Sequence, residues 1–256
     1  MTATTALANA RSVSVVVPAL NEAENIRPLV NEIIAALGHD PELEIIYVDD
    51  GSDDASPRIF AELAVELAPR FKCVRHRSRC GQSTGVSTGV RHARNPWIAT
   101  LDADGQNDPA NIPAMLAKLF EAKDPTLRLV AGWRTQRKDT WLKRISSRIA
   151  NRVRSGFLRD STPDTGCGLK VFSRELFLRL PYFDHMHRFL PALVLRAGGE
   201  TVSVPVNHRP RTQGVSKYGF HNRLWVGIVD LFGVAWLQRR AKVPVVESIT
   251  GGENKS

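Results

Sequence analysis

The sequence predicts an α/β fold in which a mostly parallel sheet lies between two layers of helices. Apolar runs typical of strands alternate with segments of helical period between residues 13 and 132. This alternating order favours parallel strands joined by right-handed crossovers. A length of 256 residues and a hydrophobic content of 43% suit one globular domain of this kind with additional elements.

Each element has its own signal. Strands are predicted at residues 13–18, 44–48, 72–75, 97–101 and 127–132, and the first is the β-branched run VSVVVP. Helices are predicted at residues 21–37, 55–67, 83–93 and 110–122. The third helix carries small residues along one face. The first repeats apolar residues three and four apart, at Ile26, Leu29, Val30, Ile33, Ile34 and Leu37.

The charge of the chain points to an anionic partner. Lys and Arg number 35 against 26 Asp and Glu, which gives a net charge of +9. Such a surface favours nucleic acid, anionic lipid headgroups or phosphate-bearing substrates. The three cysteines, Cys73, Cys80 and Cys167, are an odd number without metal-ligand spacing, so we expect a reducing compartment and no disulfide framework.

No targeting or membrane-spanning segment is expected. The first ten residues lack the basic region of a signal peptide. The most apolar stretch, residues 224–237, is short, contains Asp230 and is followed by basic residues. We expect residues 1–11 to be disordered and residues 243–256 to form a flexible tail.

Two carboxylates follow the fourth predicted strand. Asp102 and Asp104 stand where the apolar run 97–101 ends, and a turn-rich stretch comes next. Open α/β sheets place ligands at this end of their strands. Two hard oxygen ligands with room for water suit Mg²⁺ or Mn²⁺ carrying a diphosphate. The alternative is that this Asp-x-Asp is a solvated turn.

Polar residues also follow the first two strands, at Pro18 to Glu22 and at Asp49 to Asp54. Because parallel strands end at one edge, the three clusters should line one crevice, where a divalent cation would relieve repulsion between carboxylates. Asp50 or Asp49 could accept hydrogen bonds from a ribose hydroxyl or a base N–H. The alternative is that Asp53 or Ser52 caps the helix that follows.

Taken together, these motifs resemble a family-2 glycosyltransferase of GT-A fold, a Rossmann-like three-layer α/β/α architecture. The resemblance is to the branch of dolichol-phosphate mannose synthase and undecaprenyl-phosphate glycosyltransferases, and it covers about residues 12–240. The motifs that carry it are Val16 to Glu22, Val48 to Asp54, Leu101 to Pro109, Gly132-Trp133-Arg134, Asp164 to Gly168 and Arg211 to Gly219.

The resemblance implies roles for individual residues. Those lining the nucleotide-sugar pocket would be Pro18, Asn21, Glu22, Asp50 and Asp102. Those holding Mg²⁺ or Mn²⁺ and the diphosphate would be Asp102, Asp104 and Gln106. The acceptor phosphate would be faced by Arg134, Lys143, Arg144, Ser147, Asp164, Arg211, Ser216 and Lys217. Among these, Asp104, Arg134 and Arg211 would be catalytic. The choice between Lys143 and Arg144 stays open, and the order of residues 164–168 departs locally from the family pattern.

A basic segment independently favours a phosphate acceptor. Nine basic residues lie between Arg134 and Arg159 against Asp139 alone. Apolar residues recur at helical spacing from Trp141, so residues 141–158 are expected to form an amphipathic basic helix. Such a helix suits an anionic membrane surface. The alternatives are a solvated face packed on the sheet, or nucleic-acid binding, which no recognised motif supports. Arg154 and Arg159 are expected to be solvated.

The apolar segment near the C-terminus has two interpretations. Residues 219–242 could form a core helix, or an interfacial helix lying in one membrane leaflet after the catalytic domain of residues 12–218. The second places the chain at the cytoplasmic face of the inner (plasma) membrane as a peripheral or monotopic protein.

The sequence also contains several weaker signals. The histidines share no metal spacing and are each expected to be structural. Residues 80–83 could meet a phosphate or base, or Gln82 or Ser83 could simply cap a helix. Residues 214–219 suggest a loop that closes over the site.

The resemblance implies an inverting transfer of a sugar from a nucleotide sugar to a polyprenyl phosphate, for glycosylation of the cell envelope. A phosphate oxygen is already anionic near pH 7, so no general base is needed. The alternatives are a family-2 enzyme acting on a saccharide or glycolipid hydroxyl, and a non-catalytic basic membrane-binding protein. The donor is left open between GDP-mannose and UDP-linked sugars.

Overall fold

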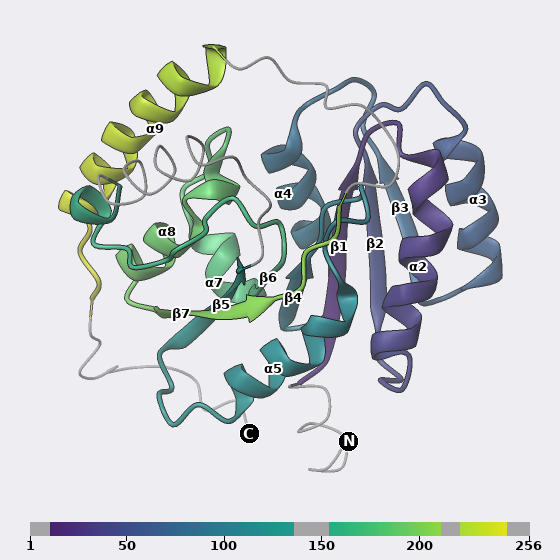
Figure 1. Cartoon of the computed structure of the whole chain (residues 1–256), viewed down its shortest axis with the longest axis horizontal. Coiled ribbons are helices and arrows are strands. Elements are labelled where there is room, and N and C mark those ends of the chain that lie inside the picture. Colours follow the sequence, from purple (N-terminus) through teal and green to yellow (C-terminus); the bar gives the residue numbers. More distant parts are fainter. Residues whose placement is uncertain (1–10, 136–153, 211–220, 245–256) are drawn as a thin grey trace, which may run out of the picture.

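The computed structural model describes residues 11–135, 154–210 and 221–244, of which 221–225 only as backbone. Within them a seven-stranded sheet lies between two layers of helices (Figure 1). Its order is β3-β2-β1-β4-β6-β5-β7. The strands are β1 Val13–Ala19, β2 Glu44–Asp49, β3 Phe71–Arg75, β4 Trp97–Thr100, β5 Leu127–Arg134, β6 Lys170–Ser173 and β7 Glu200–Val206.

The sheet is mostly parallel, as predicted. Strand β1 pairs in parallel with β2 and β4, β2 with β3, and β5 with β7. Strand β6 lies between β4 and β5 and runs antiparallel to both. The five predicted strands are confirmed, whereas β6 and β7 were not predicted.

Helices cover both faces of the sheet. On one face are α2 Ala23–Leu37, α3 Ser56–Glu66 and α5 Ile112–Phe120, which share a buried core with alternate residues of β1. On the other are α4 Gln82–His92, α7 Arg174–Arg179, α8 Leu190–Arg196 and α9 His221–Arg239. The three-layer architecture is therefore confirmed, and its two apolar cores leave the strand ends for polar groups.

The first helix starts later than predicted. Asn21 has a left-handed backbone with φ 54°, so helix α2 begins at Ala23 and not at residue 21. The backbone N–H of Asn21 donates to Ser52 Oγ at 2.9 Å, and the N–H of Asp53 donates to Asn21 Oδ1 at 2.9 Å. These bonds join the loops that follow β1 and β2.

Small residues bring α4 close to the sheet. A Cβ atom at Gly85 would lie 2.8 Å from Pro18 Cβ, and one at Gly89 would overlap Val16. The backbone of α4 therefore packs directly on β1. This contact brings the first turn of α4, with Gln82 and Ser83, to the edge where β1 and β4 end.

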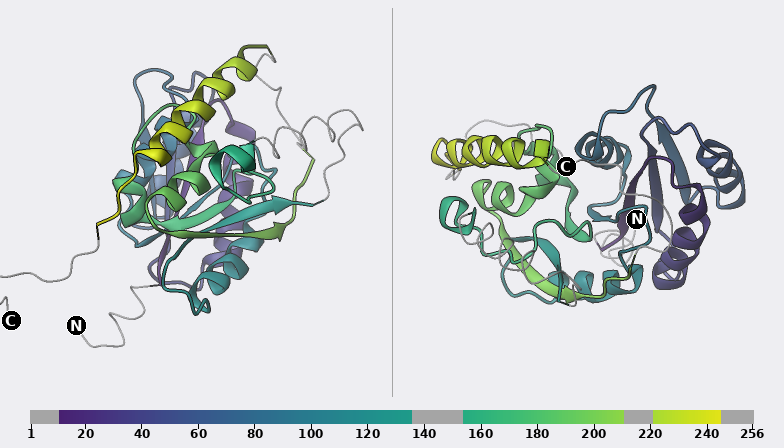
Figure 2. Two further views of the ribbon diagram at one scale, coloured as in Figure 1. Left: turned by 90° about the vertical axis from the view of Figure 1, so that its left-hand side faces the viewer. Right: turned by 45° about the horizontal axis from the view of Figure 1, so that its top comes forward.

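Helix α9 lies on the outside of the molecule, against α8 (Figure 2). Val234 and Ala235 are buried, whereas Val229, Phe232 and Trp236 are 67%, 57% and 58% exposed. The segment is therefore neither a core helix nor fully exposed, because one face packs inward and an apolar stripe faces outward. Among the described helices, none combines the length and apolarity that crossing a membrane would require.

Candidate active site

The carboxyl ends of β1, β2 and β4 lie side by side, as the sequence predicts. Ala19 pairs with Asp49 across β1 and β2, and Val16 pairs with Thr100 across β1 and β4. The loops that begin at these strand ends contain the predicted polar clusters. Ligands of open α/β sheets bind at this edge.

The aspartate that ends β2 points into the fold. Asp49 is fully buried, and its Oδ1 accepts the backbone N–H of Ser52 at 2.8 Å. Its Oδ2 lies 3.3 Å from Nε of Arg75. Of the two candidates for contact with a nucleoside, Asp49 therefore has a structural role. The prediction that Asp53 or Ser52 caps the next helix is wrong. At the start of α3, the N–H of Ser56 donates to Asp54 Oδ1 at 2.9 Å.

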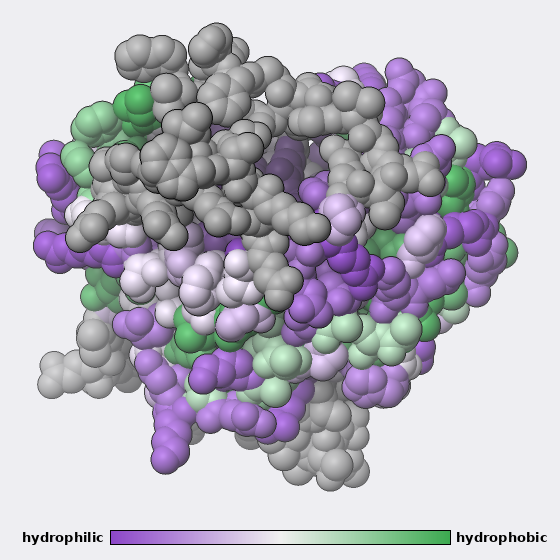
Figure 3. Space-filling view, in the orientation of Figure 1, coloured by the Kyte–Doolittle hydropathy of each residue, from purple (hydrophilic) through white to green (hydrophobic). Residues whose placement is uncertain are grey.

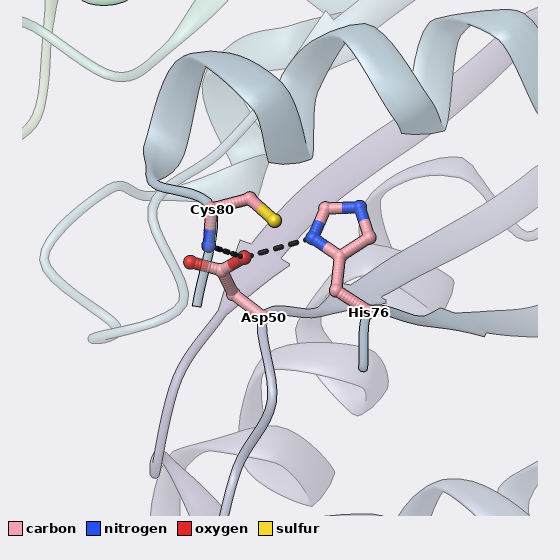
Figure 4. A group of neighbouring side chains, drawn as sticks. All are labelled: Asp50, His76 and Cys80. Carbon is pink, nitrogen blue, oxygen red and sulfur yellow. Dashed lines mark hydrogen bonds and ion pairs between the residues drawn. The ribbon is translucent and has the colours of Figure 1, made fainter. Parts of the chain in front are cut away.

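Asp50 organises the loop that leads into α4 (Figure 4). Its Oδ1 accepts the N–H of Cys80 and lies near His76 Nδ1, both at 2.8 Å, and its Oδ2 accepts the N–H of Gly81 at 2.8 Å. His76 is oriented in turn by Thr88, at 3.0 Å. A carboxylate has sites for about four hydrogen bonds. Asp50 can therefore accept one more N–H, such as that of a base.

Asp50, His76 and Cys80 could also form a metal site, because their potential ligand atoms lie within 4.8 Å of one another. Their hydrogen bonds oppose this reading. The carboxylate of Asp50 faces two backbone N–H groups, and a metal would have to replace these interactions. The arrangement is that of a hydrogen-bonded loop anchor.

Asp102 and Asp104 lie on a tightly held turn after β4. The N–H of Asp102 donates to Asn107 Oδ1 at 2.9 Å, and the N–H of Gln106 donates to Asp104 Oδ1 at 3.1 Å. From α4, Gln82 Nε2 donates to Asp102 Oδ1 at 2.7 Å. Gln82 therefore belongs to the candidate site. The alternative prediction that Gln82 or Ser83 caps α4 is wrong, because Gly81 occupies the N-cap position.

The electrostatics of this turn suit a cation. Burial and the nearby charge of Asp104 raise the pKa of Asp102 to about 6, against the opposing charges of Lys170 and Arg134. A divalent cation would remove both causes of the shift, because it replaces lost hydration and neutralises two carboxylates. The backbone of Gly168 also packs directly against the carboxylate of Asp102, because a Cβ atom at Gly168 would overlap this carboxylate. The donor set of two carboxylates and the Gln106 amide fits Mg²⁺ or Mn²⁺.

Lys170 is a buried cation that the sequence analysis missed. Its Nζ donates to the carbonyl oxygens of Cys167 and Thr165, and it is only 4% exposed. Burial lowers its pKa, while the charges of Cys167, Asp102 and Asp164 raise it, with a net lowering. The one available signal was a lysine inside an apolar run, LKVF, where a charged side chain requires partners.

Arg134 and Asp164, predicted separately at the acceptor side, contact each other. Arg134 lies at the end of β5, and its Nε and Nη2 donate to the two carboxylate oxygens of Asp164 at 2.6 and 2.9 Å. Burial lowers the pKa of Arg134, but the hydrogen bonds and charge of Asp164 outweigh it, so the pKa is raised. Nη1 of Arg134 takes no part in these two hydrogen bonds to Asp164.

A second histidine contacts the first turn of α4. Ser83 Oγ lies 2.7 Å from His187 Nδ1, and both residues line a cavity of about 20 Å³ together with Asp102 and Lys170. Burial is the main cause that holds the pKa of His187 well below its ordinary value, so the ring is neutral. Through its two contacts with Ser83, His187 holds the first turn of α4 in place.

The chain after β7 returns to the Asp102–Gln106 turn. Asn107 forms a backbone bridge with His208, and the N–H of Arg209 donates to the carbonyl of Gln106 at 3.0 Å. Arg209 also lies 2.8 Å from Asp108. His208, which the sequence did not connect to the site, is thus placed beside it. Six predicted acceptor residues lie outside the described residues: Lys143, Arg144, Ser147, Arg211, Ser216 and Lys217.

The basic segment is described only at its end. Residues 154–158 are helical, as predicted. The expectation that Arg154 is solvated is wrong, because it is buried and pairs with Asp160, which has no exposed surface. Arg159 is exposed, as expected.

The sequence of this chain is similar to those of several known proteins. Residues 14–180 match the family model described as glycosyl transferase family 2. The chain is 35% identical over 230 residues to dodecaprenyl-phosphate galacturonate synthase of Rhizobium johnstonii, covering 88% of this chain and 67% of that protein. It is 34% identical over 211 residues to undecaprenyl-phosphate 4-deoxy-4-formamido-L-arabinose transferase of Enterobacter sp., covering 81% and 63%. The chain thus spans about two thirds of the length of these relatives.

Solved structures show the same fold. A mannosyltransferase from Pyrobaculum calidifontis in complex with GDP-Man and Mn²⁺ gives a TM-score of 0.64 at 24% identity, covering 91% of this chain and 65% of that one. Glucosyl-3-phosphoglycerate synthase from Mycobacterium tuberculosis, with Mn²⁺, UDP and phosphoglyceric acid, gives 0.64 at 20% identity, covering 93% and 82%. At these identities the likeness concerns the fold alone.

Proposed function

This chain belongs to glycosyl transferase family 2, and on that premise we propose that it transfers a sugar from a GDP- or UDP-linked donor to a polyprenyl phosphate, with inversion at the anomeric carbon. The curated relatives carry the acceptor in their names, as dodecaprenyl and undecaprenyl phosphate. The observation that carries the proposal in this structure is the turn of Asp102, Asp104 and Gln106 after β4, where the charge of Arg134 acts on Asp102.

The donor would lie over the ends of β1, β2 and β4. Its nucleoside would contact Pro18, Asn21, Glu22 and the remaining acceptor site of Asp50. Asp102, Asp104 and Gln106 would hold Mg²⁺ or Mn²⁺, which neutralises charge on the departing nucleoside diphosphate. The raised pKa of Asp102 and the packing of Gly168 against its carboxylate support a cation at this position.

The acceptor would approach on the side of Arg134. A phosphate monoester is largely anionic near pH 7, so its oxygen can attack the anomeric carbon without a general base. The task of the protein is to overcome repulsion between two phosphorylated substrates and to align them. Arg134 would serve this purpose, and Arg211 follows two residues after Arg209, whose backbone bonds to Gln106. Lys143, Arg144, Ser147, Ser216 and Lys217 remain predictions for the same role.

We place the protein on an anionic membrane at the cytoplasmic face, as a peripheral or monotopic protein. Support comes from the outward stripe of α9, where Val229, Phe232 and Trp236 lie at intervals of three and four residues. Figure 3 shows hydrophobic side chains at the upper left edge, where α9 lies. Apolar side chains beside basic ones are typical of helices that lie in a membrane interface.

The experiment that tests the proposal is transfer from a panel of GDP- and UDP-linked sugars to undecaprenyl phosphate in detergent, with Mn²⁺ or with EDTA. We expect one or few donors to yield a sugar-linked lipid that mass spectrometry detects, and only with the cation. Absence of any lipid product across the panel would contradict the proposed acceptor.

A further inference from the structure

A second pocket lies at the C-terminal end of α9, away from the carboxyl ends of the strands. It has a volume of about 710 Å³ and forms where the last turns of α9 meet residues 156–159 and the end of α8. This volume is in the range of sites that bind small molecules. The argument for an occupant rests on its charge and on its surroundings.

Three arginines line this pocket: Arg159, Arg196 and Arg239. The described lining contains no acidic side chain. Arg196 donates one N–H, from Nε, to the carbonyl of Leu237 at 3.0 Å, which is one of its five donors. A ligand that satisfies such a set carries negative charge and several acceptor oxygens, as a phosphate does.

The backbone turns Arg159 outward. Arg159 has φ 52°, a left-handed conformation that residues other than glycine adopt rarely. The next residue, Asp160, is fully buried and paired with Arg154. This turn separates an arginine that faces the pocket from the acid that could neutralise it. Local strain of this kind persists where the surrounding structure holds it, often at ligand sites.

Among the lining residues one is aromatic, Phe157, and it connects the pocket to the outward stripe of α9. Phe157 is 47% exposed and packs edge-to-face on Phe232, with ring centroids 5.7 Å apart. Trp236 lies one turn further along the same stripe of α9. A free phosphate or a nucleic acid would leave these rings in water. An occupant with an anionic head and apolar chains would match both parts of the surface.

We propose that this pocket binds the phosphate headgroup of an anionic glycerophospholipid of the membrane, while Phe157, Phe232 and Trp236 contact its acyl region. The site is separate from the transfer site and rests on the proposed membrane association. Its role is to anchor α9 at one depth and to select anionic membranes, and hence to hold the active site at the lipid surface.

The test uses the full chain and lipids that contain neither prenyl phosphate nor a sugar donor, so its result is independent of transferase activity. The variant is Arg159→Gln/Arg239→Gln. The matched control, Arg240→Gln/Lys242→Gln, removes the same charge just beyond α9 at two exposed residues outside the pocket. Circular dichroism and thermal unfolding are used to check that both variants fold.

Binding is first measured by sedimentation with phosphatidylcholine vesicles, with and without phosphatidylglycerol. It is then measured by titration with dihexanoyl phosphatidylglycerol below its micelle concentration. We expect phosphatidylglycerol to increase vesicle binding and the short-chain lipid to bind saturably. Both should be weakened about tenfold in the Arg159/Arg239 variant, with a smaller change in the control.

Three results would overturn the proposal. Equal losses in the two variants would mean diffuse attraction between a basic surface and the membrane. Binding of inorganic phosphate as tightly as the short-chain lipid would identify a free anion as the ligand. A concentration-dependent dimer that fails to bind vesicles would identify a second copy of the chain as the partner of α9.

Discussion

The guanidinium of Arg134 is held on both carboxylate oxygens of Asp164, from Nε at 2.6 Å and from Nη2 at 2.9 Å. The two side chains are 14% and 8% exposed. The planar fork of an arginine fits a carboxylate and a phosphate equally well. An acceptor phosphate bound at the proposed site would therefore compete with Asp164 for the same N–H groups of Arg134.

Replacing Asp164 with Asn should strengthen acceptor binding. The change removes a negative charge beside the proposed acceptor phosphate and frees Arg134, so the KM for undecaprenyl phosphate should fall about three- to tenfold. Folding stability should fall by up to about 3 kcal/mol, because a partly buried guanidinium loses its partner. Steady-state kinetics and thermal unfolding measure the two effects.

The matched control is Asp160→Asn, which removes the acid of another buried arginine pair, that with Arg154. It should lower stability without changing the acceptor KM. An Asp164→Asn enzyme with an unchanged KM and a kcat lower by a factor of about a thousand would contradict this account, since such a result indicates action in the chemical step.

Cation binding should depend on the ionisation of Asp102. Its pKa of about 6 means that protons compete with the cation below that pH. We expect the affinity for Mn²⁺ to fall by up to about tenfold for each pH unit below 6. Titration calorimetry at pH 5, 6 and 7 tests this, and a pH-independent affinity would mean that Asp102 does not ligate the ion.

The same shift affects the stability of the metal-free protein. The unfolded chain loses the Asp102 proton near the ordinary value of 3.8, whereas the folded chain keeps it until about 6. Between these values the folded state binds more protons, so stability should decrease as pH rises. Asp102→Asn should remove this contribution, which denaturant unfolding between pH 4 and 7 measures.

Gly168→Ala should displace Asp102, because the added Cβ would overlap its carboxylate. We expect Mn²⁺ affinity to fall about tenfold or more, as for other changes that move a ligand indirectly. Gly227→Ala is the control, since a Cβ there meets nothing within 4 Å. Equal Mn²⁺ affinity in the two variants would show that the contact with Gly168 does not position Asp102.

We expect the outward stripe of α9 to contact the membrane. This contact should not be required for transferase activity in detergent. Phe232→Ser/Trp236→Ser should lower partition into phosphatidylglycerol vesicles by about tenfold or more, because two exposed apolar side chains are lost. Thermal stability should change little. Val65→Ser, at an 82% exposed position on α3, is the control. Unchanged vesicle binding would exclude this stripe from the interface.

The sequence predicted the first half of the fold well, since each strand from β1 to β5 is a distinct apolar run of four to eight residues with a helix or a turn on either side. It did not predict β6, which has four residues, begins with the buried Lys170 and runs antiparallel. Helices α7 and α8 have six and seven residues, too few to display a helical period. Strand β7 is mostly half-exposed and contains Pro205.

The candidate site was predictable where it follows local sequence, at the strand ends that carry Asp50 and Asp102. Contacts between distant segments were not. The pairing of Arg134 with Asp164 spans 30 residues and depends on β6 lying beside β5. Likewise, the contact of Gln82 with Asp102 depends on how closely α4 packs on β1 through Gly85 and Gly89. Such contacts follow from the topology and not from local spacing.

The most direct test of the central claim compares two acceptors that differ only in the phosphate. Wild-type protein and Asp104→Ala would be incubated with the active donor, Mn²⁺ and either undecaprenyl phosphate or undecaprenol, and the lipids examined by mass spectrometry. We predict a sugar-phospholipid from undecaprenyl phosphate with the wild-type protein alone, and no product from undecaprenol. Donor hydrolysis without a lipid product, or transfer to undecaprenol or to an added saccharide instead, would contradict the claim that the acceptor is a polyprenyl phosphate.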